Sequence, residues 1–157
     1  LITGPTGTGK TWLACALANH ACRNGFSALY LRMPRLFQQI ELAKADGSFP
    51  KLFTSFAKTQ LMILDDWGLA PMSDEQKRDL LEVIDDRHNQ SSTIITSQLP
   101  VKLWHETIND MTLADAILDR VVHSAHRIEL KGESMRKKLA DKMEKRRHNN
   151  KLKMSVA

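Results

Sequence analysis

The sequence predicts an α/β protein, a three-layer sandwich in which a mostly parallel, five-stranded sheet lies between helices. Short apolar runs suited to buried strands alternate with helical segments along the chain. This alternation favours a parallel sheet, because each parallel strand is reached through a crossover that is usually a helix. At 157 residues, without an internal repeat or linker, the chain fits a single domain.

Five segments are predicted strands, at residues 1–3, 28–31, 61–64, 93–96 and 127–130. The apolar run at 61–64 is too short for a helix and suits the centre of a parallel sheet. The predicted helices cover 9–22, 36–44, 50–58, 73–88, a short segment from 100, 113–122 and 133–147. Gly25 marks the end of the first helix, and Ser73 with Gln76 forms a capping box that begins the fourth.

Positive charge is concentrated at the C-terminus. Residues 131–157 hold 10 of the 23 Lys and Arg and 3 of the 18 Asp and Glu, a net charge of +7 that leaves −2 for residues 1–130. This excess fits either a solvated helix end or a segment that contacts nucleic-acid phosphates. We expect residues 1–147 to form a core that lacks its N-terminal portion, since the chain begins inside a strand, and 148–157 to form a flexible basic tail.

Membrane insertion and a disulfide framework do not fit this sequence. No apolar run approaches the ~20 residues of a membrane span. The two cysteines, Cys15 and Cys22, lie on one predicted helix, too far apart for a disulfide. We expect both to be buried free thiols, which suits a protein of the reducing cytoplasm.

Residues 4–11 read Gly-Pro-Thr-Gly-Thr-Gly-Lys-Thr, the G-x-x-x-x-G-K-[ST] pattern of the phosphate loop of nucleoside triphosphatases. Glycines permit turns that other residues resist, so that successive backbone N–H groups point at phosphate oxygens. Lys10 should reach the β- and γ-phosphates of ATP, and the Thr11 hydroxyl should ligate Mg²⁺. The residues expected to bind the nucleotide are Gly4, Pro5, Thr6, Gly7, Thr8, Gly9, Lys10 and Thr11.

Two carboxylates, Asp65 and Asp66, directly follow the apolar run at 61–64. Ligands bind at the carboxyl ends of strands in open α/β sheets, so both should lie beside the phosphate loop. Asp65 should orient Mg²⁺, largely through its water ligands. Asp66 stands where related ATPases place a base, often Glu, that polarises the attacking water. The shorter Asp predicts slow turnover or, as an alternative, a nucleotide-gated scaffold with almost no hydrolysis.

Three later polar residues are further candidates. Ser97 and Gln98 end the strand at 93–96, where a side chain can contact the γ-phosphate or the attacking water. Polar residues also end strands simply because they form turns. Arg120 could be a solvated neighbour of Asp119, or an arginine finger that reaches the ATP site of the next subunit.

Several blocks together resemble the IstB family, the helper ATPases encoded beside the transposase in certain bacterial insertion sequences. The blocks are residues 4–11, 61–66, 92–100, 104–106, 114–120 and 130–136. The resemblance covers nearly the whole chain. It implies an ATPase of the AAA+ superfamily, close to the helicase loader DnaC and the initiator DnaA.

The resemblance also implies roles for particular residues. Residues 4–11 match the Walker A motif, Asp65 and Asp66 match Walker B, Ser97 or Gln98 falls at sensor 1, and Arg120 at the arginine finger. The stretch 34–58 corresponds to a helical insertion in the central channel of the oligomer. Its candidate DNA contacts are Lys44, Lys51 and Lys58. Family members assemble on double-stranded DNA as ATP-dependent oligomers, recruit the transposase and stimulate strand transfer.

The sequence departs from the family pattern at both ends. The N-terminal helical domain is not among these residues, and the C-terminus leaves no room for a full helical lid, so Arg136 is a weak candidate for sensor 2. One alternative is a DnaC-like helicase loader, which would need an N-terminal helicase-binding element. Another is a small-molecule P-loop kinase, which would need an acceptor pocket and an Arg-bearing lid.

Overall fold

The computed structural model describes residues 1–140, 142 and 143. Within them, five strands form one parallel sheet in the order β2-β3-β4-β1-β5. The strands are β1 (Ile2–Thr3), β2 (Ala28–Arg32), β3 (Leu61–Trp67), β4 (Ser92–Ser97) and β5 (Ile128–Glu129). Strand β1 lies between β4 and β5 and is therefore an interior strand of the sheet. The loop that follows it begins beside the carboxyl end of β4.

The helices lie close to their predicted places. They are α1 (Lys10–Arg23), α2 (Met33–Asp46), α3 (Phe49–Lys58), α4 (Asp74–Arg87), α5 (Trp104–Ile108) and α6 (Met111–Val122), with a 3-10 turn at Val101–Leu103. Helix α2 begins earlier than predicted, because Pro34 fits within the first turn of a helix. After β5, residues 135–140, 142 and 143 are helical, and the predictions for 144–147 and for the tail at 148–157 lie outside the described residues.

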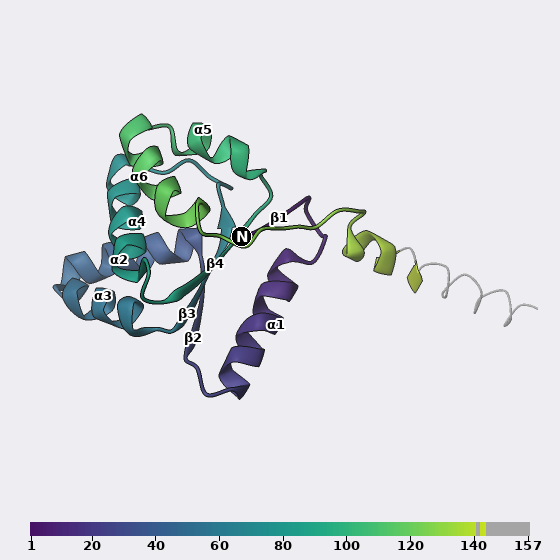
Figure 1. Cartoon of the computed structure of the whole chain (residues 1–157), viewed down its shortest axis with the longest axis horizontal. Helices are drawn as coiled ribbons and strands as arrows, with labels where there is room; N and C mark the ends of the chain where they lie inside the picture. Colours follow the sequence, from purple (N-terminus) through teal and green to yellow (C-terminus); the bar gives the residue numbers. More distant parts are fainter. Residues whose placement is uncertain (141, 144–157) are drawn as a thin grey trace, which may run out of the picture.

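The sheet separates two unequal helical layers. Figure 1 shows α1 on one face of the sheet and the other labelled helices gathered on the opposite face. Alternate residues of β3 serve the two sides: Ile63 packs with Ala14 of α1, whereas Met62 and Leu64 join the larger core beneath α2 to α6. The predicted three-layer sandwich is therefore confirmed, with one layer made by a single helix.

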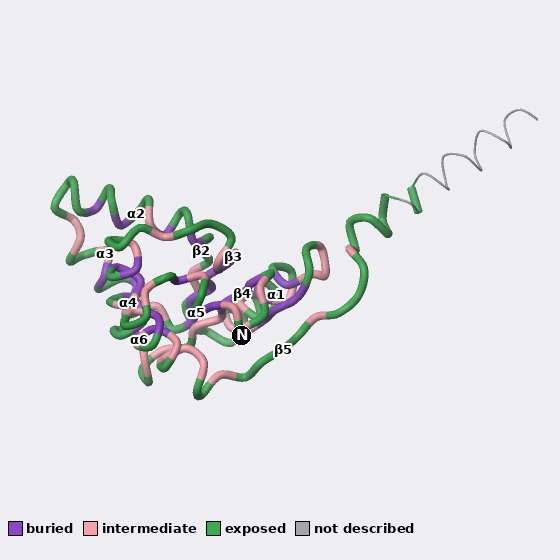
Figure 2. The backbone as a smooth tube through the Cα atoms, turned by 90° about the horizontal axis from the view of Figure 1, so that it is seen from above, coloured by how far each residue is buried: buried purple, intermediate pink, exposed green. Residues whose placement is uncertain are grey.

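The layer of one helix explains a wrong prediction. Both Cys15 and Cys22 are exposed rather than buried. Helix α1 directs Ala14 into the sheet, so the neighbouring Cys15 falls on the outward face, which no other described element covers. Figure 2 shows that the chain after β5 is also largely exposed. None of the helices within residues 1–140, 142 and 143 has the length and apolar character needed to cross a bilayer.

Candidate nucleotide-binding site

The phosphate loop, residues 4–11, connects the carboxyl end of β1 to α1. The side chain of Lys10 crosses this loop, and its Nζ donates to the carbonyl oxygens of Gly4 at 2.8 Å and Pro5 at 2.9 Å. Burial lowers the pKa of Lys10, an effect that the nearby carboxylates of Asp65 and Asp66 oppose. The ammonium group is thus held by neutral acceptors, and phosphate oxygens would bind it more strongly because they are charged.

Two loop glycines allow another part of the chain to approach closely. Gly4 and Gly7 have φ angles of 146° and 82°. A Cβ on Gly4 would lie 2.2 Å from the Leu130 carbonyl oxygen, and one on Gly7 would lie 2.1 Å from Ser134 Oγ. Both glycines are therefore required by contact as well as by conformation. The block 130–136 packs against the loop, and the charge of Arg136 adds to the lowering of the Lys10 pKa.

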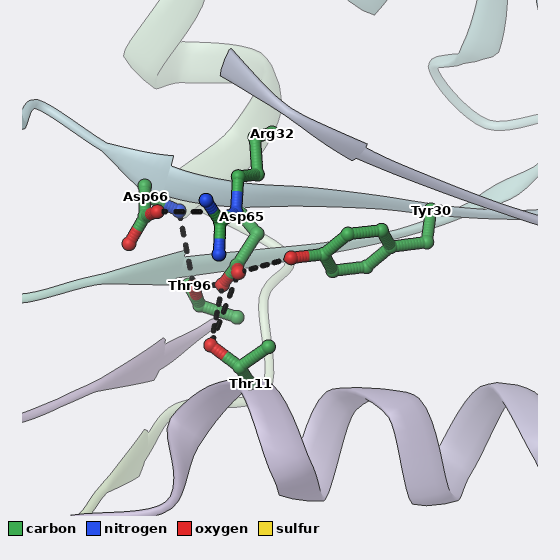
Figure 3. A network of polar contacts seen from close by, with 6 residues as sticks. All are labelled: Thr11, Tyr30, Arg32, Asp65, Asp66 and Thr96. Atoms are coloured by element: carbon green, nitrogen blue, oxygen red, sulfur yellow. Dashed lines mark hydrogen bonds and ion pairs between the residues drawn. The ribbon is translucent and has the colours of Figure 1, made fainter. Parts of the chain in front are cut away.

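Asp65 is 1% exposed and accepts hydrogen bonds from three hydroxyl groups, as Figure 3 shows. Thr11 Oγ1 lies 3.1 Å and 3.0 Å from its Oδ1 and Oδ2. The Tyr30 hydroxyl donates to Oδ2 at 2.6 Å, and the Thr96 hydroxyl donates to Oδ1. Groups from β2, β4 and α1 thus converge on a carboxylate of β3, which fixes it in front of Thr11.

The oxygen atoms gathered here fit Mg²⁺. The Thr11 hydroxyl and the Asp65 carboxylate are hard donors of the kind this ion prefers. Residues 1–140, 142 and 143 contain no cluster of three or more His, Cys, Asp or Glu side chains that could hold a metal ion. A cation at this place would take its other ligands from phosphate and water, as Mg²⁺ commonly does beside a nucleotide.

Asp66 has a backbone conformation that is uncommon for a residue with a side chain, with φ at 66°. The pairing of β3 with β4 shifts register between Leu64 and Trp67, and such a bulge turns a side chain away from the regular alternation. The Asp66 carboxylate lies 3.8 Å from Arg32 Nε at the end of β2 (Figure 3). Consecutive carboxylates therefore differ in environment: Asp65 is buried against Thr11, and Asp66 is partly exposed.

The two candidates at the end of β4 also have different surroundings. Ser97 is fully buried, and its hydroxyl donates to the Trp67 carbonyl at 2.8 Å and accepts from Leu99 N at 3.0 Å. Gln98 Oε1 accepts a hydrogen bond from the Thr6 hydroxyl at 2.5 Å. Of the two, Gln98 faces the phosphate loop, whereas Ser97 fastens the turn after β4 to β3.

Arg120 lies towards the edge of the sheet where the strands begin. It pairs with Asp85 of α4 rather than with Asp119, and its Nη1 donates to the Ala116 carbonyl at 2.7 Å. It lines a hollow of about 570 Å³ together with Leu61 and Ser92, the first residues of β3 and β4. The phosphate loop lies at the opposite, carboxyl edge, so Arg120 does not face the loop of its own chain.

The three lysines predicted to contact DNA differ in whether a carboxylate of the same chain pairs with them. Lys44 Nζ lies 2.8 Å from Glu75 Oε1 and 2.7 Å from Asp79 Oδ1 of α4. Lys51 and Lys58 are exposed on α3. Two carboxylates of the same chain therefore pair with Lys44, and the DNA contacts of all three lysines stay predictions.

The site also includes Tyr30, Arg32 and Thr96, which no sequence pattern indicated. Their contacts arise from the strand order β2-β3-β4, in which Arg32 pairs with Asp65 across the sheet. The available signal was the period of two along a strand, which puts Tyr30 and Arg32 on the same face near its carboxyl end. This period alone does not show that the two side chains face Asp65, because that depends on which strand lies beside β2.

The chain is similar to several known proteins. The profile of a family described as IstB-like ATP binding protein matches residues 1–143. The insertion sequence ATP-binding protein y4pL of Sinorhizobium fredii is 57% identical over 136 residues, which are 87% of this chain and 56% of that protein. The IS21 ATP-binding protein of Pseudomonas aeruginosa is 33% identical over 138 residues, 88% of this chain and 52% of that protein. The chain spans about half the length of the curated relatives it matches.

Solved structures share the fold. The replication initiator DnaA bound to AMPPCP and single-stranded DNA superposes with a TM-score of 0.71 at 17% identity, covering 92% of this chain and 44% of that one. The DnaC helicase loader superposes with a TM-score of 0.68 at 21% identity, covering 83% of this chain and 76% of that one. The predicted P-loop α/β fold, shared with DnaA and DnaC, is confirmed. At such low identities the likeness carries the fold alone.

Proposed function

Because the chain belongs to the family of IstB-like ATP binding proteins, we propose that it is the ATPase core of a helper protein for DNA transposition. In this proposal the intact protein assembles on double-stranded DNA in the bacterial cytoplasm, recruits the transposase of its insertion sequence and stimulates it. The observation that carries the proposal is the convergence of Lys10, Thr11 and Asp65 at the carboxyl edge of the sheet.

The proposed chemistry is ATP hydrolysis. Lys10 would exchange its two carbonyl acceptors for the β- and γ-phosphates. Thr11 and, through water, Asp65 would hold Mg²⁺, which supplies neutralisation of phosphate charge when bound. Asp66, partly exposed beside Arg32, would accept a proton from the attacking water. Gln98, hydrogen-bonded to Thr6, would contact the γ-phosphate end of the nucleotide.

The position of Arg120 favours a role in a neighbouring subunit. It does not face the loop of its own chain, and an arginine that reaches the next subunit would tie hydrolysis to assembly. Arg120→Ala should spare ATP binding and lower turnover of the assembled protein about a thousandfold or more. Asp85→Ala is the matched control, since it removes the partner of Arg120 within the chain but keeps the arginine. An equal loss in both variants would assign the effect to their ion pair instead.

DNA binding in this proposal involves the free lysines of α3. Replacing Lys51 and Lys58 with alanine should weaken binding of duplex DNA and reduce the slope of its salt dependence by about one unit for each phosphate that is no longer neutralised. Lys44→Ala is the control, because its charge is already paired with Glu75 and Asp79. An unchanged salt slope in the double variant would remove α3 from the DNA-binding surface.

Two alternatives are less well supported. A helicase loader shares the fold, but the sequence relatives are insertion sequence proteins, which favours transposition. A pull-down with the full-length protein should retain the transposase and not a replicative helicase, and the reverse result would favour helicase loading. A small-molecule kinase would need its acceptor beside the phosphates, whereas the large hollow lies at the other edge of the sheet.

The central experiment measures ATP turnover and assembly of the purified full-length protein. Duplex DNA should stimulate hydrolysis and, together with ATP, convert the protein into an oligomer. Lys10→Ala should abolish both by removing the phosphate ligand. The proposal fails if the wild-type protein does not bind ATP, or if it stays monomeric when saturated with ATP and duplex DNA.

A further inference from the structure

The chain after β5 crosses the phosphate loop before it leaves the body of the molecule, as Figure 1 shows. Leu130 N donates to the Thr3 carbonyl at 2.8 Å, and Met135 N donates to the Gly7 carbonyl at 2.9 Å. Between these two bonds, Ser134 occupies the space that a side chain on residue 7 would need. We call residues 130–135 the clasp.

The bond from Met135 fixes the orientation of one peptide group of the loop. The Gly7 carbonyl and the Thr8 N–H belong to the same planar, trans peptide group, so they point in opposite directions. With the oxygen held by the clasp, the N–H points back into the loop, where it lies 3.4 Å from the Pro5 carbonyl in a long hydrogen bond. Backbone N–H groups of such loops bind phosphate oxygens. The clasp and a phosphate would therefore hold opposite ends of one peptide group.

We propose that the clasp positions the Thr8 N–H for phosphate, so that clasp docking and nucleotide binding strengthen each other. The inference rests on the proposed binding of ATP, but on neither DNA nor transposase. A peptide group bonded at both ends is polarised by each partner, which strengthens both hydrogen bonds. By thermodynamic linkage, the factor by which the docked clasp raises ATP affinity equals the factor by which ATP stabilises the docked clasp.

This coupling would control a basic surface. The clasp leads into helical residues that carry Arg136, Lys137 and Lys138, all of them exposed. Ser134 Oγ accepts from Lys137 N at 3.4 Å, so the beginning of this helix is joined to the clasp. Binding of ATP to the phosphate loop would therefore determine the position of these three positively charged side chains.

Met135→Pro is the sharpest test, because it deletes the N–H donor and little else. Residue 135 is the first residue of its helix, where proline is tolerated since that N–H has no partner within the helix. Residue 134 precedes the helix, a position that is usually extended, as a residue before proline should be. Met135→Ala is the matched control: it removes a side chain that is 60% exposed and keeps the N–H.

In the purified full-length protein, Met135→Pro should weaken binding of a fluorescent ATP analogue with Mg²⁺ about three- to tenfold, the loss typical of one hydrogen bond. Met135→Ala should bind like the wild type. The analogue should also slow hydrogen exchange of the amides of residues 136–140 in the wild type, and not in Met135→Pro.

Equal affinities of the two variants, or exchange that the analogue leaves unchanged in the wild type, would overturn the inference and leave the proposed function intact. A wild-type protein that binds no analogue would instead overturn the proposed function, and the inference with it. The two failures are therefore distinguishable within one set of measurements.

Discussion

Tyr30→Phe tests the hydroxyl network around Asp65 with the loss of a single oxygen atom. The Tyr30 hydroxyl donates to Asp65 Oδ2 at 2.6 Å, and the aromatic ring would remain in place. The change leaves the carboxylate with the hydroxyls of Thr96 and Thr11, and Thr11 is the residue expected to turn to Mg²⁺. We therefore expect the variant to bind Mg²⁺ less tightly in the presence of nucleotide.

The magnitude follows from the kind of hydrogen bond that is lost. A hydrogen bond to a charged group contributes about 1.5–3 kcal/mol. Tyr30 is 38% exposed, so water can replace part of the contact and the lower end of this range applies. About 1.4 kcal/mol corresponds to a tenfold change. This agrees with the 10- to 100-fold losses of metal affinity typical when a group that orients a metal ligand is removed.

The assay is binding of a fluorescent ATP analogue, titrated with Mg²⁺. Half-saturation should need about ten times more Mg²⁺ in Tyr30→Phe, while affinity in excess chelator should stay at the wild-type value. Ser27→Ala is the control, because it removes a hydroxyl beside β2 that contacts Gln60 and not Asp65. The reasoning is refuted if Tyr30→Phe keeps the wild-type Mg²⁺ dependence, or if Ser27→Ala shifts it equally.

The other predictions concern Asp66, the two residues that end β4, and Lys44. Asp66→Asn should bind ATP but lose about a hundredfold in turnover, measured as phosphate release. Asp66→Glu should lower the free energy of unfolding, measured by denaturant titration, by about 1 kcal/mol, because Asp tolerates a φ of 66° better than Glu does. Ser97→Ala should lower the free energy of unfolding by about 1–3 kcal/mol, since it leaves the buried Trp67 carbonyl without its hydrogen-bond donor. Gln98→Ala should keep the wild-type melting temperature and slow phosphate release. Lys44→Ala should raise the pKa of Glu75, now lowered by the Lys44 hydrogen bond, back towards 4.5 in a carboxyl NMR titration. The stability that the Lys44–Glu75 pair contributes is present above pH 4.5, and it is lost as the pH falls through the lowered pKa of Glu75.

Sequence motifs predicted those candidate site residues that lie close together within one segment of the chain. Gly4 to Gly9 form the turn between β1 and α1, and Lys10 and Thr11 begin α1. An apolar run places Asp65 at the carboxyl end of β3. These positions could be predicted because the local conformation follows from glycine, from helix signals and from the alternation of strands and helices.

Contacts between segments could not be predicted in the same way. The partners of Asp65 come from β2 and β4, and only the register of three strands brings Tyr30 and Thr96 to it. Lys44 was named only as a candidate DNA contact, because nothing in the local sequence shows that α4 places two carboxylates beside it. The choice between Ser97 and Gln98 likewise depended on a turn that buries one and exposes the other.

The bare outer side of α1 has a practical use. Cys15 and Cys22 are the two thiols of this sequence, and both can be reached from solvent on the helix that follows the phosphate loop. A spin label or dye could be attached to one of them on α1, with the other changed to serine. In the assembly that we propose, distances between such labels on adjacent protomers would report how the subunits are arranged.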